Sequence, residues 1–93
     1  MIDAEIGKQL MRSCSSVGAN YIEANESLSK KDFLMRIRIC RKEAKESGYW
    51  LRLVEPATPN LRDERDSLLQ ESKELMKIFG SIITTSDGRN PNL

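Results

Sequence analysis

Apolar and polar residues alternate along this chain with the period of amphipathic helices. In three segments the apolar positions recur at steps of three and four residues, which places them on one side of an α-helix. The segments predict helices over residues 3–25, 30–55 and 59–84. Because the connections between them are short, the pattern predicts an all-α fold, an up-and-down antiparallel helical bundle.

The first predicted helix has a core face of small and polar residues. Gly18 lies within it and lowers its helix propensity, so this glycine either permits close approach of a neighbouring helix or is merely tolerated. The positions expected to face the core are Ile6, Leu10, Ser13, Val17, Asn20 and Ala24.

The start of the second predicted helix has the strongest local signals in the chain. Ser29 is placed to cap the first turn, where the carboxylate of Asp32 also favours the helix dipole. Leu28 and Phe33 occupy the two positions of a hydrophobic staple. The helix is expected to end at Glu55, because the residue before a proline avoids the α conformation.

The third predicted helix begins with Thr58 as its cap and Pro59 at its first position, where the missing N–H of proline costs least. Its core positions are Leu61, Leu68, Ser72, Leu75, Phe79 and Ile82. The three helices form one predicted domain over residues 1–85. Residues 86–93 are polar, contain glycine and proline, and are predicted to be a disordered tail.

The second helix is apolar on two sides. Its core positions, Phe33, Ile37, Cys40, Ala44 and Leu51, project in one direction at about 100° per residue. A second group projects well round to another side and is predicted to form a subunit interface: Met35, Ile39, Trp50 and Leu53. A helix that is apolar on two sides needs two packing partners. The second partner is either another copy of the chain or a segment that the chain lacks.

The composition is that of a protein with no signal for a particular ligand. Charged residues make up 31% of the 93 residues and the net charge is +1, so no overall field selects a nucleic acid or an anionic membrane. No apolar run resembles a signal peptide or a membrane span. Cys14 and Cys40 are therefore expected to be reduced, small buried groups in a cytoplasmic protein rather than a disulfide.

Basic residues are concentrated in the middle of the chain, where residues 30–55 carry a net charge of +4. A stripe along the second helix is the candidate nucleic-acid contact: Lys31, Arg38, Arg41, Lys42, Lys45 and Arg52. Such a row can neutralise phosphates and would make binding dependent on salt. The alternative is an ordinary solvated helix face, and the single aromatic beside the stripe provides little base stacking.

Signals for catalysis, metals and cofactors are absent, and we expect no catalytic, metal-binding or cofactor-binding residue. The chain contains no histidine to act as a base for a serine or for Cys14. Ser13 and Ser16 are interpreted as small residues that allow helices to approach closely. Asn20 either sets the register of the bundle or faces a ligand or channel.

One set of residues extends over about 45 positions of the first two predicted helices. It begins with Arg12, Ser13, Ser16, Asn20 and Glu23 and continues through Ser29, Lys31-Asp32-Phe33, Ile39, Lys42-Glu43-Ala44 and Tyr49-Trp50-Leu51. In the order and spacing of these residues the chain resembles the 23S rRNA intervening-sequence proteins. Arg12 and Glu23 lie about three turns apart and are expected to pair with charges on the second helix or across a subunit boundary.

The resemblance implies a four-helix bundle, homopentamers with a central channel, and no established activity for most members. It extends to accessory proteins of retroelements, which bind nucleic acid beside a reverse transcriptase. Two features depart from the family pattern. The helix that usually precedes the Arg12 motif is short or missing, so the chain is either a shortened form or begins too late. Ala24 follows Glu23 where the family often has glycine, which is a minor difference.

Overall fold

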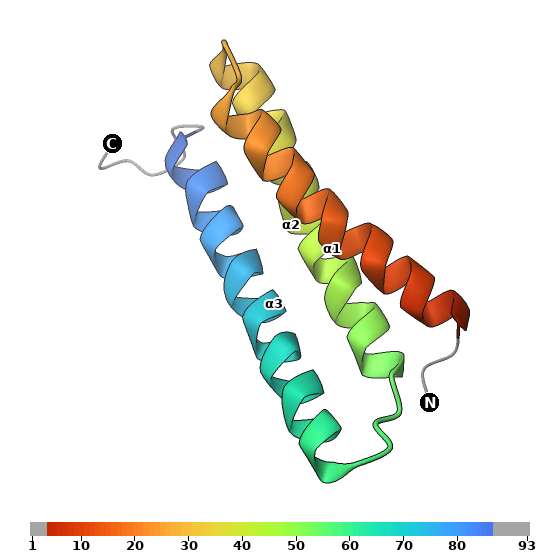
Figure 1. The fold of residues 1–93 in the computed structure, drawn as a ribbon. Helices are drawn as coiled ribbons and strands as arrows, with labels where there is room; N and C mark the ends of the chain where they lie inside the picture. The colour runs from red at the N-terminus through yellow and green to blue at the C-terminus, as the bar shows by residue number, and fades with distance from the viewer. Residues whose placement is uncertain (1–3, 87–93) are drawn as a thin grey trace.

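The computed structural model describes residues 4–86, which form three α-helices and, within that range, no β-strand (Figure 1). They are α1 (Ala4–Asn25), α2 (Lys30–Leu53) and α3 (Pro59–Ser86). Successive helices run antiparallel (Figure 1). α2 packs against both α1 and α3, whereas no Cα atom of α1 comes within 8 Å of one in α3. The predicted all-α class is confirmed, with α2 as the helix that joins the other two.

The predicted cap at the start of α2 is confirmed, and the predicted staple beside it is wrong. Ser29 has extended backbone (φ −134°, ψ 154°), and its side chain accepts a hydrogen bond from the backbone N–H of Asp32 at 3.1 Å. Leu28, however, is fully exposed and does not cover Phe33. The turn before α2 presents this leucine to solvent, so the hydroxyl cap defines the start of the helix without a staple.

The other two helix ends follow from local chemistry. α2 ends at Leu53, two residues earlier than predicted, because Val54 is already extended and donates its N–H to the Leu51 carbonyl. Thr58 caps α3 as predicted, since its Oγ1 accepts from the N–H of Leu61 at 3.2 Å. The predicted starting residue Asp3 lies outside the described residues, as do 87–93 of the predicted tail, whereas Ser86 belongs to α3.

The core is concentrated where the first half of α2 meets α1 and the last turns of α3. Ile37 and Cys40 of α2 are fully buried there. The remaining buried members of this core are Ala24, Ala44, Phe79 and Ile83, with Val17, Phe33, Met76 and Ile82 partly buried against them. Each of the three helices therefore contributes apolar side chains to one cluster.

Glycine permits a close helix contact at Gly48 and not at Gly18. A Cβ atom built on Gly48 would lie 3.0 Å from the Ser72 hydroxyl and 3.6 Å from a Leu69 methyl group, so α2 and α3 touch closely at this position. Around Gly18 there is no such atom within 4 Å among the described residues. Of the two interpretations of Gly18, the structure favours simple tolerance.

Candidate functional site

A polar seam joins α1 to α2 on one side of the core. Arg12 of α1 donates to the carboxylates of both Glu43, at 3.2 Å, and Glu46. Glu46 also accepts from the indole Nε1 of Trp50 at 3.2 Å. These bonds hold the pKa of Glu46 below its ordinary value, and the bond to Glu46 raises the pKa of Arg12. The expected pairing of Arg12 with charges on the second helix is thus confirmed.

Two serines form a buried polar contact in this seam. The hydroxyls of Ser13 and Ser47 lie 3.0 Å apart and both side chains are buried. Each hydroxyl also lies within hydrogen-bond distance of a carbonyl oxygen in its own helix, at 3.1 Å for Leu10 and 2.9 Å for Glu43. These bonds satisfy both hydroxyls, and the small side chains let α1 and α2 approach. Ser47 was not singled out by the sequence pattern.

Asn20 connects the same two helices one core layer further along. Its amide nitrogen donates to the Ser16 carbonyl at 2.9 Å and to the Ser16 hydroxyl at 3.1 Å, and its amide oxygen accepts from Arg36 of α2 at 3.0 Å. The polar atoms of this half-buried side chain therefore have protein partners. The geometry favours a role in helix register over a ligand-facing one. Glu23 is exposed on α1.

The two thiols lie in different environments. Cys40 is fully buried, its Sγ lies 3.5 Å from the Val17 carbonyl oxygen, and burial raises the pKa of the thiol. Cys14 is exposed and lies 3.6 Å from the Ser47 hydroxyl, so its predicted burial is wrong. The reason is that Cys14 faces an uncovered groove. Both cysteines are free, and residues 4–86 hold no group of three His, Cys, Asp or Glu side chains that would bind a metal ion.

That groove runs between α1 and α3, with α2 as its floor. We call it the apolar groove, and it is lined mainly by Leu10, Val17, Leu51, Leu61, Leu68 and Leu75. Leu61, Leu68 and Leu75 were predicted core residues of the third helix, yet they are 49%, 50% and 37% exposed. They are exposed because α1 and α3 each pack on α2 without meeting over its floor. Glu64 and Glu71 of α3 lie on its rim.

A second uncovered surface lies on the opposite side of α2. This α2 outer face consists of the predicted interface residues Met35, Ile39, Trp50 and Leu53. Met35 is 46% and Leu53 is 41% exposed, whereas Ile39 and Trp50 are half-buried. Trp50 stacks edge-on against Tyr49, with ring centroids 4.9 Å apart. This face is therefore partly open, and its role as a subunit interface stays a prediction.

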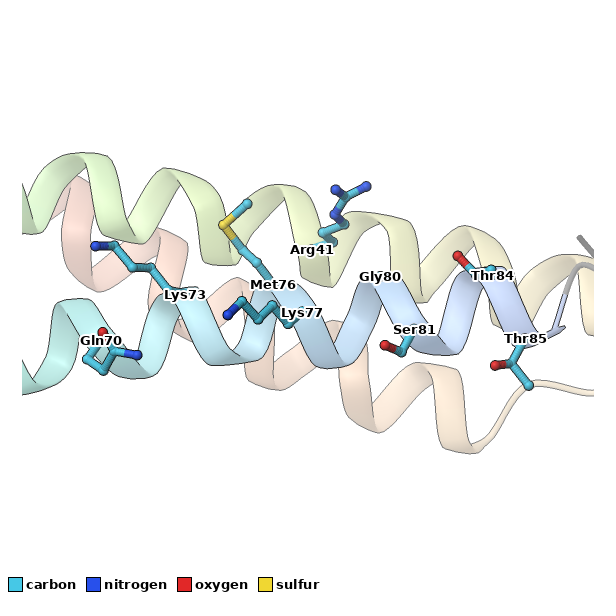
Figure 2. Close-up of a pocket in the computed structure, with 9 residues that line it drawn as sticks. All are labelled: Arg41, Gln70, Lys73, Met76, Lys77, Gly80, Ser81, Thr84 and Thr85. Atoms are coloured by element: carbon cyan, nitrogen blue, oxygen red, sulfur yellow. The ribbon is translucent and has the colours of Figure 1, made fainter. Parts of the chain in front are cut away.

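The basic stripe divides into two parts in the structure. Arg38, Arg41, Lys42 and Lys45 line the junction of α2 with α3, whereas Lys31 and Arg52 are exposed and are not among the residues that line it. Two lysines of α3, Lys73 and Lys77, face the same junction (Figure 2). The sequence pattern missed these lysines because it treats each helix alone and does not show which faces meet.

The fold and these polar contacts define an all-α protein of antiparallel helices held together around a central one. A family model described as 23S rRNA-intervening sequence protein matches residues 2–81. This chain therefore belongs to the 23S rRNA-intervening sequence protein family. The described helices include none that is long and apolar enough to cross a membrane.

A solved structure resembles this one closely. It is the crystal structure of a protein of unknown function from the S23 ribosomal protein family of Bacteroides thetaiotaomicron, with 37% sequence identity and a TM-score of 0.77. The match covers 87% of this chain and 75% of that one. Among curated proteins, none matches the chain. The comparisons thus establish the family and its fold, and leave the function to be inferred from the surfaces.

Proposed function

We propose that this protein is a non-enzymatic helical module that associates with copies of itself. In this proposal the apolar groove of one copy receives the α2 outer face of the next. Three helices of one copy and α2 of its neighbour then form a four-helix bundle between two chains. The observation that carries the proposal is the apolar groove, whose leucines are half exposed in a single chain.

The groove is too apolar to be an ordinary solvated surface. Leu61, Leu68 and Leu75 recur every seven residues, the spacing of a helix–helix seam. Exposed leucines scattered singly are normal, but contiguous apolar patches indicate an interaction site. A helix laid over the groove would cover these three leucines, whereas Leu51 on its floor is already buried.

The α2 outer face is a suitable occupant because it is one side of a helix, which is convex, and the groove is concave. Lys31 and Lys42 lie one helical turn from Met35 and Ile39, and their charge is opposite to that of the glutamates on the groove rim, which outnumber the one arginine there. Two different surfaces on opposite sides of one chain associate head to tail, and such interfaces close into rings when the rotation permits. A ring of five is the assembly that the family resemblance implies.

The non-enzymatic part of the proposal is supported by how the reactive groups are held. The hydroxyls of Ser13 and Ser47 are bonded to each other and to carbonyl oxygens, and the chain has no histidine to act as their base. Cys40 is buried with a raised pKa, which disfavours the nucleophilic thiolate. These contacts serve helix packing.

Light scattering of the purified chain tests the association. We expect a particle larger than the monomer, and a well-folded monomer at all accessible concentrations would overturn the proposal. Leu68→Glu disrupts the groove and Met35→Glu disrupts the α2 outer face at positions of similar exposure, 50% and 46%. Ile22→Glu is the matched control, because Ile22 is 63% exposed on α1 outside both surfaces.

Mixing the two variants tests the head-to-tail arrangement. Leu68→Glu keeps an intact outer face and Met35→Glu keeps an intact groove. The mixture should therefore form a one-to-one pair that neither variant forms alone. If the pair does not form although each variant is folded and monomeric, the two surfaces do not meet each other, and the head-to-tail arrangement is overturned.

A further inference from the structure

A cationic groove follows the junction of α2 and α3. Its basic residues are Arg38, Arg41, Lys42 and Lys45 from α2 and Lys73 and Lys77 from α3. Figure 2 shows the α3 lysines along the helix beside Arg41 of α2. Where α2 and α3 run together, the groove thus gathers basic side chains from residues 38–45 of one helix and 73–77 of the other.

The two glutamates of α2 lie outside the cationic groove. Glu43 and Glu46 both face α1, where Arg12 pairs with them. No carboxylate is among the described side chains that line the cationic groove. On α3, Glu74 follows Lys73 in the sequence and accepts a hydrogen bond from Gln70 at 3.5 Å. In the middle of α2, Glu43 and Glu46 thus face α1, whereas the bases from Arg41 to Lys45 line the junction with α3.

The dimensions of the cationic groove suit a chain of phosphates. Its α3 wall extends from Gln70 to Thr85, about 22 Å at a helical rise of 1.5 Å per residue. A stacked strand carries one phosphate per roughly 3.4 Å, so this length spans about six of them. Ser81, Thr84 and Thr85 add hydroxyl groups to the α3 wall, and such groups often donate to phosphate oxygens.

We infer that the cationic groove binds the sugar–phosphate backbone of a nucleic acid. The bases that carry the inference are Arg41, Lys42, Lys45, Lys73 and Lys77. The lining residues include no aromatic side chain on which bases would stack, so binding should depend on charge more than on sequence. This activity goes beyond self-association and does not require it, because every residue of the groove lies on one copy.

Fluorescence anisotropy with labelled nucleic acids across a salt series tests the inference. The probes are single-stranded RNA, duplex RNA and duplex DNA of mixed sequence, which distinguish among the sources of the backbone. We expect binding at low salt that weakens steeply as salt rises. Binding that is absent at low salt for all three probes would overturn the inference.

Charge reversal locates the site. The double variant Lys73→Glu/Lys77→Glu should lose affinity by about tenfold or more and show a shallower salt dependence. The control Lys8→Glu/Lys30→Glu makes the same change in net charge at exposed positions outside the groove. Equal losses in the two double variants would show that only net charge matters, which would contradict the inference.

Two further measurements distinguish nucleic-acid binding from capture of an acidic protein and from self-association. A polyglutamate peptide that displaces RNA as well as unlabelled RNA does would indicate an acidic protein partner and overturn nucleic-acid binding. The monomeric Leu68→Glu variant should still bind RNA, although less tightly than an assembly with several grooves. If the chain does not self-associate, the RNA measurement still tests the cationic groove. If RNA does not bind, light scattering still tests self-association.

Discussion

The hydroxyl oxygens of Ser13 and Ser47 lie 3.0 Å apart at the buried contact between α1 and α2. Side chains of this size allow the two backbones to approach, and the hydrogen bonds satisfy the hydroxyls without water. A larger residue at either position must separate the helices. The contact thus sets the spacing on which the neighbouring bonds of Arg12 and Asn20 depend.

Replacement of Ser13 by leucine should destabilise the fold by overpacking this contact. We expect Ser13→Leu to lower the free energy of unfolding by about 1–3 kcal/mol, measured by urea denaturation followed by circular dichroism. Ser15→Leu is the control, because Ser15 is exposed on the same helix. Equal stability of the two variants would show that the helices do not meet closely at Ser13.

Two of the glycines in helices, Gly18 and Gly48, should respond differently to alanine. Gly18→Ala has open space around the new methyl group and should raise the free energy of unfolding by about 0.5–1 kcal/mol through helix propensity. Gly48→Ala should fall short of that gain, because its methyl group would press on the Ser72 hydroxyl at 3.0 Å. Gly48→Val should lower the free energy by about 1–3 kcal/mol. Thermal unfolding of the three variants measures this order, and equal gains from both alanine variants would contradict it.

Ile37 should be the most sensitive of the core residues to truncation. It is fully buried in the cluster shared by the three helices, so Ile37→Ala should cost about 2–5 kcal/mol through lost burial and the cavity left behind. Ile78→Ala removes the same atoms from a side chain that is 53% exposed and should change stability little. Urea denaturation of both variants provides the comparison. If Ile37→Ala lowers the free energy of unfolding only slightly, Ile37 is not at the centre of the core.

The pKa of Glu46 predicts a dependence of stability on pH. Hydrogen bonds from Trp50 and Arg12 lower this pKa from its ordinary 4.5. A lowered folded-state pKa contributes stability that is complete above the unfolded pKa and is lost as pH falls through the folded pKa. The wild-type chain should therefore lose more stability between pH 6 and pH 3 than Glu46→Gln does.

Unfolding curves at the two pH values test this expectation. Glu74→Gln serves as the control, because it removes one carboxylate from α3, far from the Arg12 seam in sequence. Identical pH dependence in the wild type and Glu46→Gln would mean that the Trp50 and Arg12 bonds do not persist in solution.

Features that depend on a few neighbouring residues could be predicted from the sequence. The caps at Ser29 and Thr58 are examples, because each requires only a hydroxyl three residues before the N–H that it accepts. The end of α2 was misplaced although Pro56 was recognised, because proline constrains only the residue before it and leaves the earlier turn free. The hydrophobic staple failed since the path of the chain before a cap depends on tertiary contacts.

Features that depend on how helices rotate against each other were less predictable. The pattern placed Leu61, Leu68 and Leu75 in the core, but it does not reveal that α1 and α3 stay apart above them. It identified one wall of the cationic groove from the α2 stripe and missed Lys73 and Lys77 on the other wall. Arg36, the partner of Asn20, was missed for the same reason, since a charged residue near a core face gives no signal of its own.

The central position of α2 has a consequence for how the molecule unfolds. Because α1 and α3 each pack against α2 and not closely against each other, the chain consists of two antiparallel hairpins that share one helix. Opening of α1 leaves most contacts between α2 and α3 intact, and the reverse holds for α3. Loss of α2 removes both sets of contacts. In native-state hydrogen exchange the amides of α2 should therefore be the slowest, with α1 and α3 exchanging as separate cooperative units.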